Sequence, residues 1–249
     1  MTRRELAAAL APVADGDEAL EAKLIWETFP TEEGRQAALS RRLRGEPLQY
    51  ILGEWEFMGL PFFVGPQALI PRPDTETLCE AALAFLQDKP RARVLDLCCG
   101  SGCIGVSLGK LAGAEVTFAD ISPKALALAE QNARRNGVFG TFIESDMFAH
   151  VPGTFDLIAC NPPYLTQEEM QKLQREVTFE PALALFGGTD GLDFYRRLAV
   201  DWQEHVVPGG ALVMEIGYTQ GPAVQNLFPG SRVLKDYGHR DRVVCVKKQ

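Results

Sequence analysis

The sequence predicts an α/β fold in which a mostly parallel sheet with helices on both faces follows a small helical N-terminal domain and a β-hairpin linker. Two observations lead to this prediction. Apolar residues recur at helical spacing up to about residue 53, whereas after Arg91 short apolar runs alternate with helical patterns. Such alternation is typical of a parallel sheet covered by helices. The 249 residues are enough for one large and one small domain.

The first part of the chain indicates helices separated by turns. Its apolar residues at near-helical spacing are Leu6, Leu10, Leu20, Leu24, Ile25 and Phe29. The segments Asp15–Asp17 and Pro30–Thr31 are expected to interrupt the helices. A further helix is expected over Thr31–Leu43, with the Thr31 side chain as its N-cap.

A hairpin and a stiff connector are expected next. Aromatic residues on both sides of Met58–Pro61 predict a β-hairpin over Glu54–Val64. Proline fixes φ, so Ile70–Pro73 forms a stiff connector. Asp74 is expected to cap the helix that runs to about Leu86. The predicted division of the chain is therefore 1–53 for the helical domain, 54–73 for the hairpin and linker, and 74–249 for the α/β domain.

Short apolar runs after Arg91 are the expected strands of the sheet. They are Arg93–Leu97, Glu115–Ala119, Thr141–Glu144, Phe155–Cys160, Ala211–Ile216, Arg232–Lys235 and Val243–Lys247. The segment 236–242 is too short for a helical crossover, so the last two strands should pair antiparallel. The clearest helix has Ser122 as its N-cap, Pro123 in its first turn and Gly137 at its end.

The charge balance narrows the class of partner. Lys and Arg number 25 against 33 Asp and Glu, which gives a net charge of −8. A broad phosphate-binding surface would need an excess of Lys and Arg, so we expect a protein or small-molecule substrate and no direct contact with nucleic acid. No run approaches the roughly 18 apolar residues of a membrane span. The six cysteines show no CxxC spacing, which predicts reduced thiols in the cytoplasm and no metal site.

The first strand of the α/β domain ends in a glycine-rich turn. Gly100, Gly102 and Gly105 give the pattern G-x-G-x-x-G, which lets a backbone approach a ligand closely at the start of a helix. Asp96 adds a negatively charged carboxylate, and a bound pyrophosphate would gain nothing from that charge. A cationic or zwitterionic ligand such as S-adenosylmethionine therefore fits better than a dinucleotide. A tight turn without a ligand is the alternative.

Acids also follow the next two strands. Asp120 ends the second strand, where a carboxylate can accept both ribose hydroxyls of an adenosine. Asp146 follows the third strand and could accept from the adenine amino group, with Met147 or Phe148 packing on the ring. The alternatives are a helix-capping acid at 120, an exposed loop acid at 146 and a core aromatic at 148.

The segment after the fourth strand, Asn161-Pro162-Pro163-Tyr164, is the most informative. Two prolines stiffen the loop and lack N–H groups, so the loop's carbonyls are available to accept. Asn161 adds a side-chain carbonyl, and Tyr164 adds a face for stacking. Such a site can hold a planar –NH2 group, aim its nitrogen at an electrophilic methyl and stabilise the positive charge that develops. The alternative is a Pro-Pro turn beside a chance Asn and Tyr.

In these motifs the chain resembles the release-factor glutamine N5-methyltransferases (the HemK/PrmC type). The Asn-Pro-Pro-Tyr motif alone would leave DNA adenine and ribosomal RNA enzymes open. The further matching segments are Tyr50–Gly53, Glu56-Phe57, Leu69–Glu76, Asp96–Gly102, Asp120–Ser122, Glu180-Pro181, Gly187–Leu192 and Glu215–Gly217. The part Pro71–Glu76 and the pair of segments Glu180-Pro181 and Gly187–Leu192 are much more specific than the four-residue motif.

The resemblance implies a Rossmann-like, seven-stranded class I methyltransferase sheet. It also implies transfer of a methyl group from S-adenosylmethionine to the glutamine amide in the Gly-Gly-Gln motif of class-I peptide release factors, with S-adenosylhomocysteine as a product. The helical domain would help to recognise the release factor, and a monomer is expected. The implied donor-binding residues are Cys98, Cys99, Gly100, Ser101, Gly102, Asp120, Met147 and Asn161. Asp146 joins this set because of its position after the third strand. The implied catalytic residues are Asn161, Pro162, Pro163 and Tyr164.

The chain departs from the family pattern at Cys98, where a glycine is usual, and at Met147, where an aromatic residue is common. Arg72 and Glu76 are expected either near the active site or as an ion pair in the linker. The alternative functions are a nucleic-acid amino-methyltransferase, which would need a basic recognition surface, and a non-catalytic adenosine-binding adaptor. A nicotinamide dehydrogenase is disfavoured because the Pro-Pro loop would have no role in it.

Overall fold

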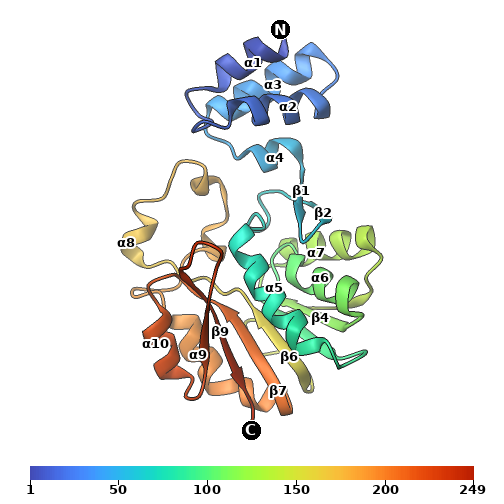
Figure 1. The fold of residues 1–249 in the computed structure, drawn as a ribbon, viewed down its shortest axis with the longest axis vertical. Coiled ribbons are helices and arrows are strands. Elements are labelled where there is room, and N and C mark those ends of the chain that lie inside the picture. Colours follow the sequence, from blue (N-terminus) through green and yellow to red (C-terminus); the bar gives the residue numbers. More distant parts are fainter.

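The computed structural model describes residues 1–249, and it places a small helical bundle above a larger α/β body (Figure 1). The bundle consists of α1 (Arg3–Leu10), α2 (Glu18–Thr28) and α3 (Glu32–Leu43), and the short α4 (Leu48–Leu52) leads toward the body. The predicted cap of α3 is confirmed, because the Thr31 hydroxyl accepts from the Gly34 amide. α4 was not predicted, since five residues are too few to show a helical period.

The bundle has its own hydrophobic core and a buried ion pair. The core residues are Leu6, Leu10, Ala14, Ala22, Ile25, Ala38, Leu48 and Ile51. Arg42 donates from Nε and Nη2 to the Glu21 carboxylate, at 2.8 Å each. Its Nη1 lies 2.6 Å from Oε1 of Glu176, which belongs to a loop of the body. Arg42 thus ties two helices of the bundle to each other and to the body.

The predicted hairpin is formed by β1 (Glu54–Phe57) and β2 (Leu60–Phe63). Met58 and Gly59 both have positive φ, 52° and 71°, as a two-residue turn between twisted strands requires. The turn is therefore shorter than the expected 58–61. Asn132 of α7 (Pro123–Asn136) accepts from the Phe63 amide and donates to its carbonyl, which fastens the hairpin to the body.

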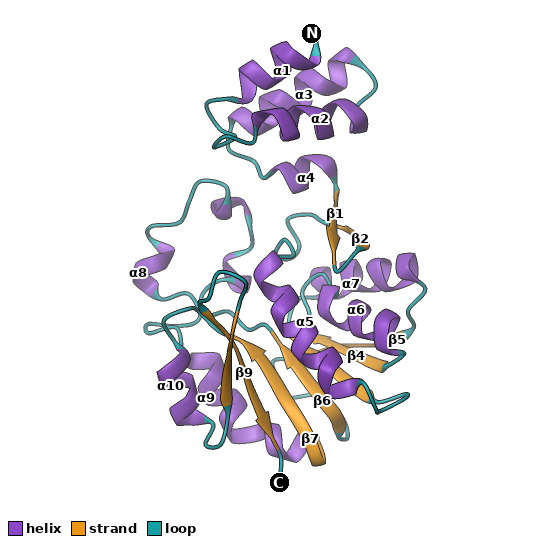
Figure 2. Cartoon of the chain, viewed as in Figure 1, coloured by secondary structure: helices purple, strands orange, loops and turns teal.

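The body is built on a seven-stranded sheet with the order β5-β4-β3-β6-β7-β9-β8 (Figure 2). Its strands are β3 (Arg93–Leu97), β4 (Glu115–Asp120), β5 (Gly140–Glu144), β6 (Phe155–Cys160), β7 (Val206–Glu215), β8 (Arg232–Lys235) and β9 (Asp241–Lys247). The first five are parallel, and β9 pairs antiparallel with both β7 and β8. The seven strands and the antiparallel last pair are confirmed; β7 begins earlier than predicted.

Helices cover both faces of the sheet, each over its own core (Figure 2). One face carries α5 (Pro73–Leu86), α6 (Cys103–Ala112) and α7; the other carries α9 (Asp193–Asp201), η3 (Trp202–His205) and α10 (Gly221–Leu227). The connection after β6 contains α8 (Gln167–Met170), η1 (Val177–Phe179) and η2 (Ala182–Ala184). The predicted Ser122 cap of α7 is confirmed, because its hydroxyl accepts from the Ala125 amide.

The predicted cap of α5 is wrong. The helix begins at Pro73, with Arg72 at the N-cap position and no side-chain cap. Proline suits the first helical position because the amide it lacks would have no partner there. Asp74 therefore lies inside the first turn, and its Oδ2 lies 2.9 Å from Nη2 of Arg242. None of the helices in the structure combines the length and the apolar character that a membrane span requires.

Candidate active site

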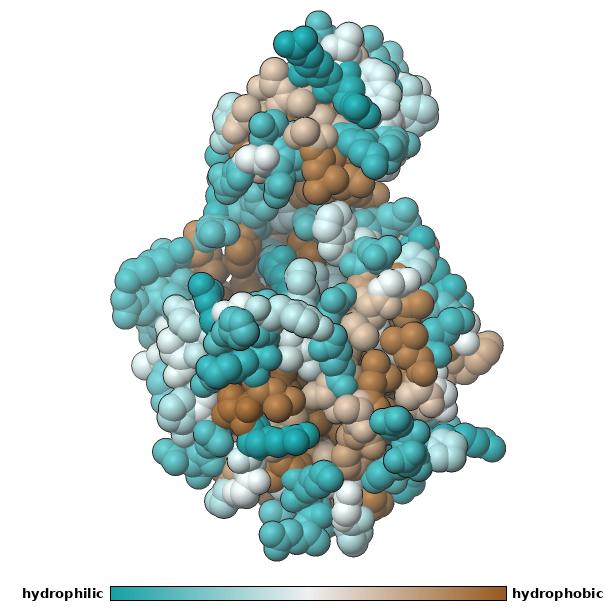
Figure 3. Space-filling view, in the orientation of Figure 1, coloured by the Kyte–Doolittle hydropathy of each residue, from teal (hydrophilic) through white to brown (hydrophobic).

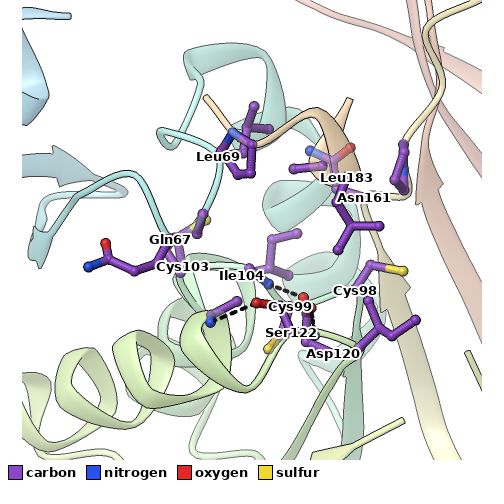
Figure 4. Close-up of a pocket in the computed structure, with 18 of the residues that line it drawn as sticks. Gln67, Leu69, Cys98, Cys99, Cys103, Ile104, Asp120, Ser122, Asn161 and Leu183 are labelled. Carbon is purple, nitrogen blue, oxygen red and sulfur yellow. Dashed lines mark hydrogen bonds between the residues drawn. The ribbon is translucent and has the colours of Figure 1, made fainter. Parts of the chain in front are cut away.

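One cavity of about 270 Å³ opens where β3, β4, β5 and β6 end at their carboxyl edges. The linker 67–72 and the segment 181–184 form further parts of its wall. Figure 4 shows Asp120 and Ser122 toward one end of the cavity and Asn161 with Leu183 toward the other. The predicted site residues on its wall are Cys98, Cys99, Gly100, Ser101, Asp120, Asp146, Met147, Asn161 and Pro163. Gly102, Pro162 and Tyr164 are not on the wall.

The glycine-rich turn has an unusual backbone at its first position. Cys98 adopts φ 58°, in the left-handed region that favours glycine, and its Sγ lies 3.7 Å from the Met147 Sδ. Gly102 has φ 76°, and a Cβ there would lie 2.9 Å from the Ala129 Cβ. Gly102 therefore lets α7 pack closely behind the turn, whereas Cys98 faces the cavity.

Asp120 ties the glycine turn to the start of α7. Its Oδ2 accepts from the Gly100 amide and its Oδ1 from the Ser122 amide, each at 2.8 Å (Figure 4). Burial raises the pKa of Asp120 above the usual value for a carboxyl group. Each carboxylate oxygen has a second lone pair, so both can still accept from a ligand hydroxyl. The side chain is thus part of the backbone scaffold and part of the cavity wall.

The carboxylate of Asp96 does not face a ligand as expected. The residue is fully buried and absent from the cavity wall, and its Oδ2 accepts from the Gly105 amide at 2.8 Å. Burial raises the pKa of Asp96 well above its usual value. Residues alternate in direction along a strand, and position 96 points toward the α6 side of the sheet. Asp96 therefore braces the start of α6 beneath the turn.

The residues that follow β5 lie partly on the cavity wall and partly in the core. Met147 lies on the cavity wall, and Asp146 pairs there with Arg197 of α9, with 2.8 Å between Oδ1 and Nη2. Phe148 is buried instead and stacks on His205, with 4.4 Å between ring centroids. The suggestion that Phe148 could pack on a bound ring is therefore wrong, and the core-aromatic alternative is correct. Met147 has φ 54°, which turns the chain between these two directions.

The loop that begins at Asn161 is pressed against a second loop of the body. A Cβ at Gly187 would lie 2.6 Å from the Tyr164 Cα and 2.7 Å from the Pro163 carbonyl oxygen. The Leu165 amide donates to the Leu185 carbonyl, and the Gly187 amide donates to the Leu165 carbonyl. Only a glycine at 187 allows this approach, so the second loop holds the position of the first.

A buried carboxylate that was given no role from the sequence lies behind this loop. Glu215 ends β7 with 2% of its surface exposed; its Oε2 accepts from Thr75 Oγ1 at 2.6 Å and its Oε1 from the Tyr164 hydroxyl at 3.3 Å. The same Thr75 oxygen accepts from Asn161 Nδ2 at 3.3 Å. Burial raises the pKa of Glu215 to about 7. An acid at the carboxyl end of a central strand is the signal that could have identified it.

Arg72 and Glu76 have different partners. Arg72 lines the cavity and pairs with the buried carboxylate of Glu180, which also accepts from the Ile70 amide. Glu76 accepts from the Met58 amide at 2.8 Å and so fastens the hairpin to α5. Of the two outcomes expected from the sequence, Arg72 is at the site, and the linker ion pair forms with Glu180 and not with Glu76.

Comparisons with known proteins show which family the chain is similar to. Residues 76–185 match the family described as the methyltransferase small domain. The chain is 44% identical over 218 residues to the release factor glutamine methyltransferase of Koribacter versatilis, covering 85% of this chain and 78% of that protein. It is 42% identical over 217 residues to the release factor glutamine methyltransferase of Chlamydia trachomatis serovar L2, covering 84% and 75%.

Solved structures show the same fold at low sequence identity. A T. thermophilus 16S rRNA N2 G1207 methyltransferase, solved in complex with AdoMet and guanosine, is 18% identical. It superposes with a TM-score of 0.58 and covers 79% of this chain and 50% of that one. The seven-stranded class I methyltransferase fold implied by the resemblance is thereby confirmed.

Proposed function

The chain belongs to the release factor glutamine methyltransferase family, and from this we propose that it methylates the glutamine amide nitrogen in the Gly-Gly-Gln motif of class-I peptide release factors. The enzyme depends on S-adenosylmethionine as the methyl donor. One observation carries the proposal for the site: Asp120 and the glycine turn share a single cavity with Asn161. Donor and acceptor groups can therefore meet in one space.

The donor end fits an adenosine. The free lone pairs of the Asp120 carboxylate suit two neighbouring ribose hydroxyls, and Ile121, Ala125 and Met147 provide apolar wall beside it. Asp146 can accept from an exocyclic amino group at the rim of the same wall. We assign Cys98, Cys99, Gly100 and Ser101 to contacts with the donor through the backbone of the turn. Gly102 lets α7 pack behind that turn.

The acceptor end fits a carboxamide. S-adenosylmethionine supplies a methyl group on a positively charged sulfur. The amide nitrogen forms the new N–C bond while the C–S bond breaks, with its electron pair going to sulfur. The nitrogen then releases a proton to water. Asn161 accepts from the –NH2 group through its side-chain carbonyl and aims the nitrogen, which is catalysis by orientation. Pro163, which lines the cavity, completes the acceptor set through its carbonyl, and Pro162 stiffens the loop from behind the wall. Tyr164 anchors the loop through Glu215.

The helical bundle is proposed as the part that recognises the release factor. We assign residues 1–53 to this domain, 54–73 to the hairpin and linker, and 74–249 to the catalytic domain. The proposal is supported by the separate core of the bundle and by the linker 67–72, which forms part of the cavity wall. Figure 3 shows a narrow waist between bundle and body, with hydrophobic side chains on the side of the bundle that faces it.

The state and location of the protein are proposals as well. We propose that the protein acts as a monomer. All six cysteines are free thiols, which suits the reducing cytoplasm. The net charge of −8 favours a protein substrate over nucleic acid.

The test is methylation of a release factor with a donor that carries a labelled methyl group, read by mass spectrometry of the Gly-Gly-Gln peptide. We expect one labelled methyl on the glutamine side chain. A release factor whose glutamine is replaced by glutamate is the control and should take no label. Label found only on added RNA or DNA would instead support the nucleic-acid alternative, and donor binding without any transfer would support the adaptor.

A further inference from the structure

A short series of hydrogen bonds runs from the interior of the body to the cavity. Glu215 lies outside the cavity wall and accepts from the Thr75 hydroxyl at 2.6 Å. Thr75 Oγ1 in turn accepts from Asn161 Nδ2 at 3.3 Å, and both Thr75 and Asn161 line the cavity. The series therefore connects a buried carboxylate to the side chain that orients the substrate amide.

The chemistry of the three groups gives this series a direction. A carboxylate can only accept, and a hydroxyl has a single proton to donate. With that proton committed to Glu215, Thr75 Oγ1 can only accept from its other neighbour. The NH2 end of Asn161 must then face Thr75, and the carbonyl end is left for the cavity. The two ends of an amide have nearly the same shape, so packing alone does not select between them.

We propose that Glu215 is a positioning residue that sets, through Thr75, which end of the Asn161 amide faces the substrate nitrogen. The inference rests on the proposed function. If the Asn161 amide were reversed, its NH2 group would meet the –NH2 group of the glutamine, donor against donor, and the nitrogen would lose its orienting acceptor. Glu215 lies outside the cavity wall, so it acts only by fixing the direction of the series.

The titration of Glu215 should then control transfer. The groups around it are Thr75, Asp74 and the thiol of Cys79 from α5, the thiol of Cys103 from α6, Tyr164 after β6, Tyr195 from α9, and Arg242 from β9. Burial raises the pKa of Glu215 to about 7, whereas Thr75 and Arg242 lower it. Below that pH the protonated carboxyl can donate to Thr75, which frees the threonine proton for Asn161 and reverses the amide. Transfer should therefore fall as the pH falls.

The experiment compares kcat and KM for release-factor methylation in wild type, Thr75→Val, Glu215→Gln and the matched control Thr77→Val. Thr77 lies on the same helix, and its buried hydroxyl has no hydrogen-bond partner. We expect Thr75→Val and Glu215→Gln to lower kcat roughly 10- to 100-fold, the range that misorientation produces. The KM for the donor should stay within about twofold, and Thr77→Val should retain kcat within about twofold. Thr75→Ser keeps the hydroxyl and should recover most of the rate.

The pH profile provides the readout that a merely structural role would not change. In wild type, kcat should decline below about pH 7, and in Glu215→Gln this decline should be absent. An unchanged kcat in Thr75→Val and Glu215→Gln would overturn the inference, as would equal losses in Thr75→Val and Thr77→Val. If wild type itself does not methylate the glutamine, the proposed function fails; an active wild type with unaffected variants contradicts only the role of Glu215.

Discussion

The two ends of the cavity are built in different ways. At the donor end, the Asp120 carboxylate binds backbone amides, one of them 20 residues away, and the turn it holds lies within one strand-helix-strand unit. At the acceptor end, side chains meet from segments 86 and 140 residues apart, as Thr75 bonds to Asn161 and to Glu215. Donor binding should therefore depend on local backbone, and transfer should depend on the packing of distant elements.

The largest effect is expected from Asn161→Ala. Removing the side-chain carbonyl leaves the glutamine nitrogen without its orienting acceptor, and transfer should fall by about 10³-fold. Donor affinity, measured by calorimetry, should weaken only a few-fold, because Asp120 and the turn remain. Asn226→Ala on α10, an exposed site away from the cavity, is the control and should match wild type. Retained turnover in Asn161→Ala would contradict the orienting role.

The same contrast explains how far the site can be predicted from sequence. The donor turn and the 161–164 loop are contiguous stretches at strand ends, so a strand pattern is enough to bring them to one edge of the sheet. Thr75 and Glu215 become partners of Asn161 only through the packing of α5 on β7 and its neighbours, which no local pattern encodes. Arg72 likewise meets Glu180 across 108 residues of chain.

Two errors made from sequence at the site have a related cause, since both concern the direction of a side chain. Asp96 lies in the predicted strand, but it points toward α6 and not into the cavity. Phe148 follows a residue with positive φ, which turns it into the core. The segments were identified correctly in both cases; the backbone angles that aim the side chains arise from tertiary packing.

A second test places a methyl group between the two loops of the acceptor end. In Gly187→Ala the new Cβ would lie 2.6 Å from the Tyr164 Cα, so backbone must move. A displacement near 1 Å at the reacting loop should lower transfer by about 10²-fold. Donor affinity should stay within a few-fold of wild type. The control is Gly238→Ala, where the nearest atom would be a carboxylate oxygen at 3.2 Å; equal activity of the two variants would contradict the tight fit of the loops.

Asp120→Ala tests the donor end. Its expected effect is smaller and falls on donor affinity, whereas the two preceding substitutions affect the transfer rate. Losing hydrogen bonds from a charged acceptor should cost about 1.5–3 kcal/mol of donor binding, which is roughly 10- to 150-fold in affinity. At saturating donor the transfer rate should change by less than about threefold, because the acceptor loop is intact. Calorimetry with S-adenosylhomocysteine measures the affinity. An unchanged affinity would remove the ribose assignment of Asp120.

The smallest effect is expected at Cys98, and it separates backbone from side chain at the donor end. Cys98→Gly and Cys98→Ala both remove the thiol, but only glycine adopts φ 58° without strain. Cys98→Gly should therefore be more stable than Cys98→Ala by about 1 kcal/mol, measured by denaturant unfolding. If this end binds its ligand through backbone, the two variants should also share a donor affinity within about threefold of wild type. A tenfold loss in both would instead assign the contact to the sulfur, and the donor end would then depend on side chains as the acceptor end does.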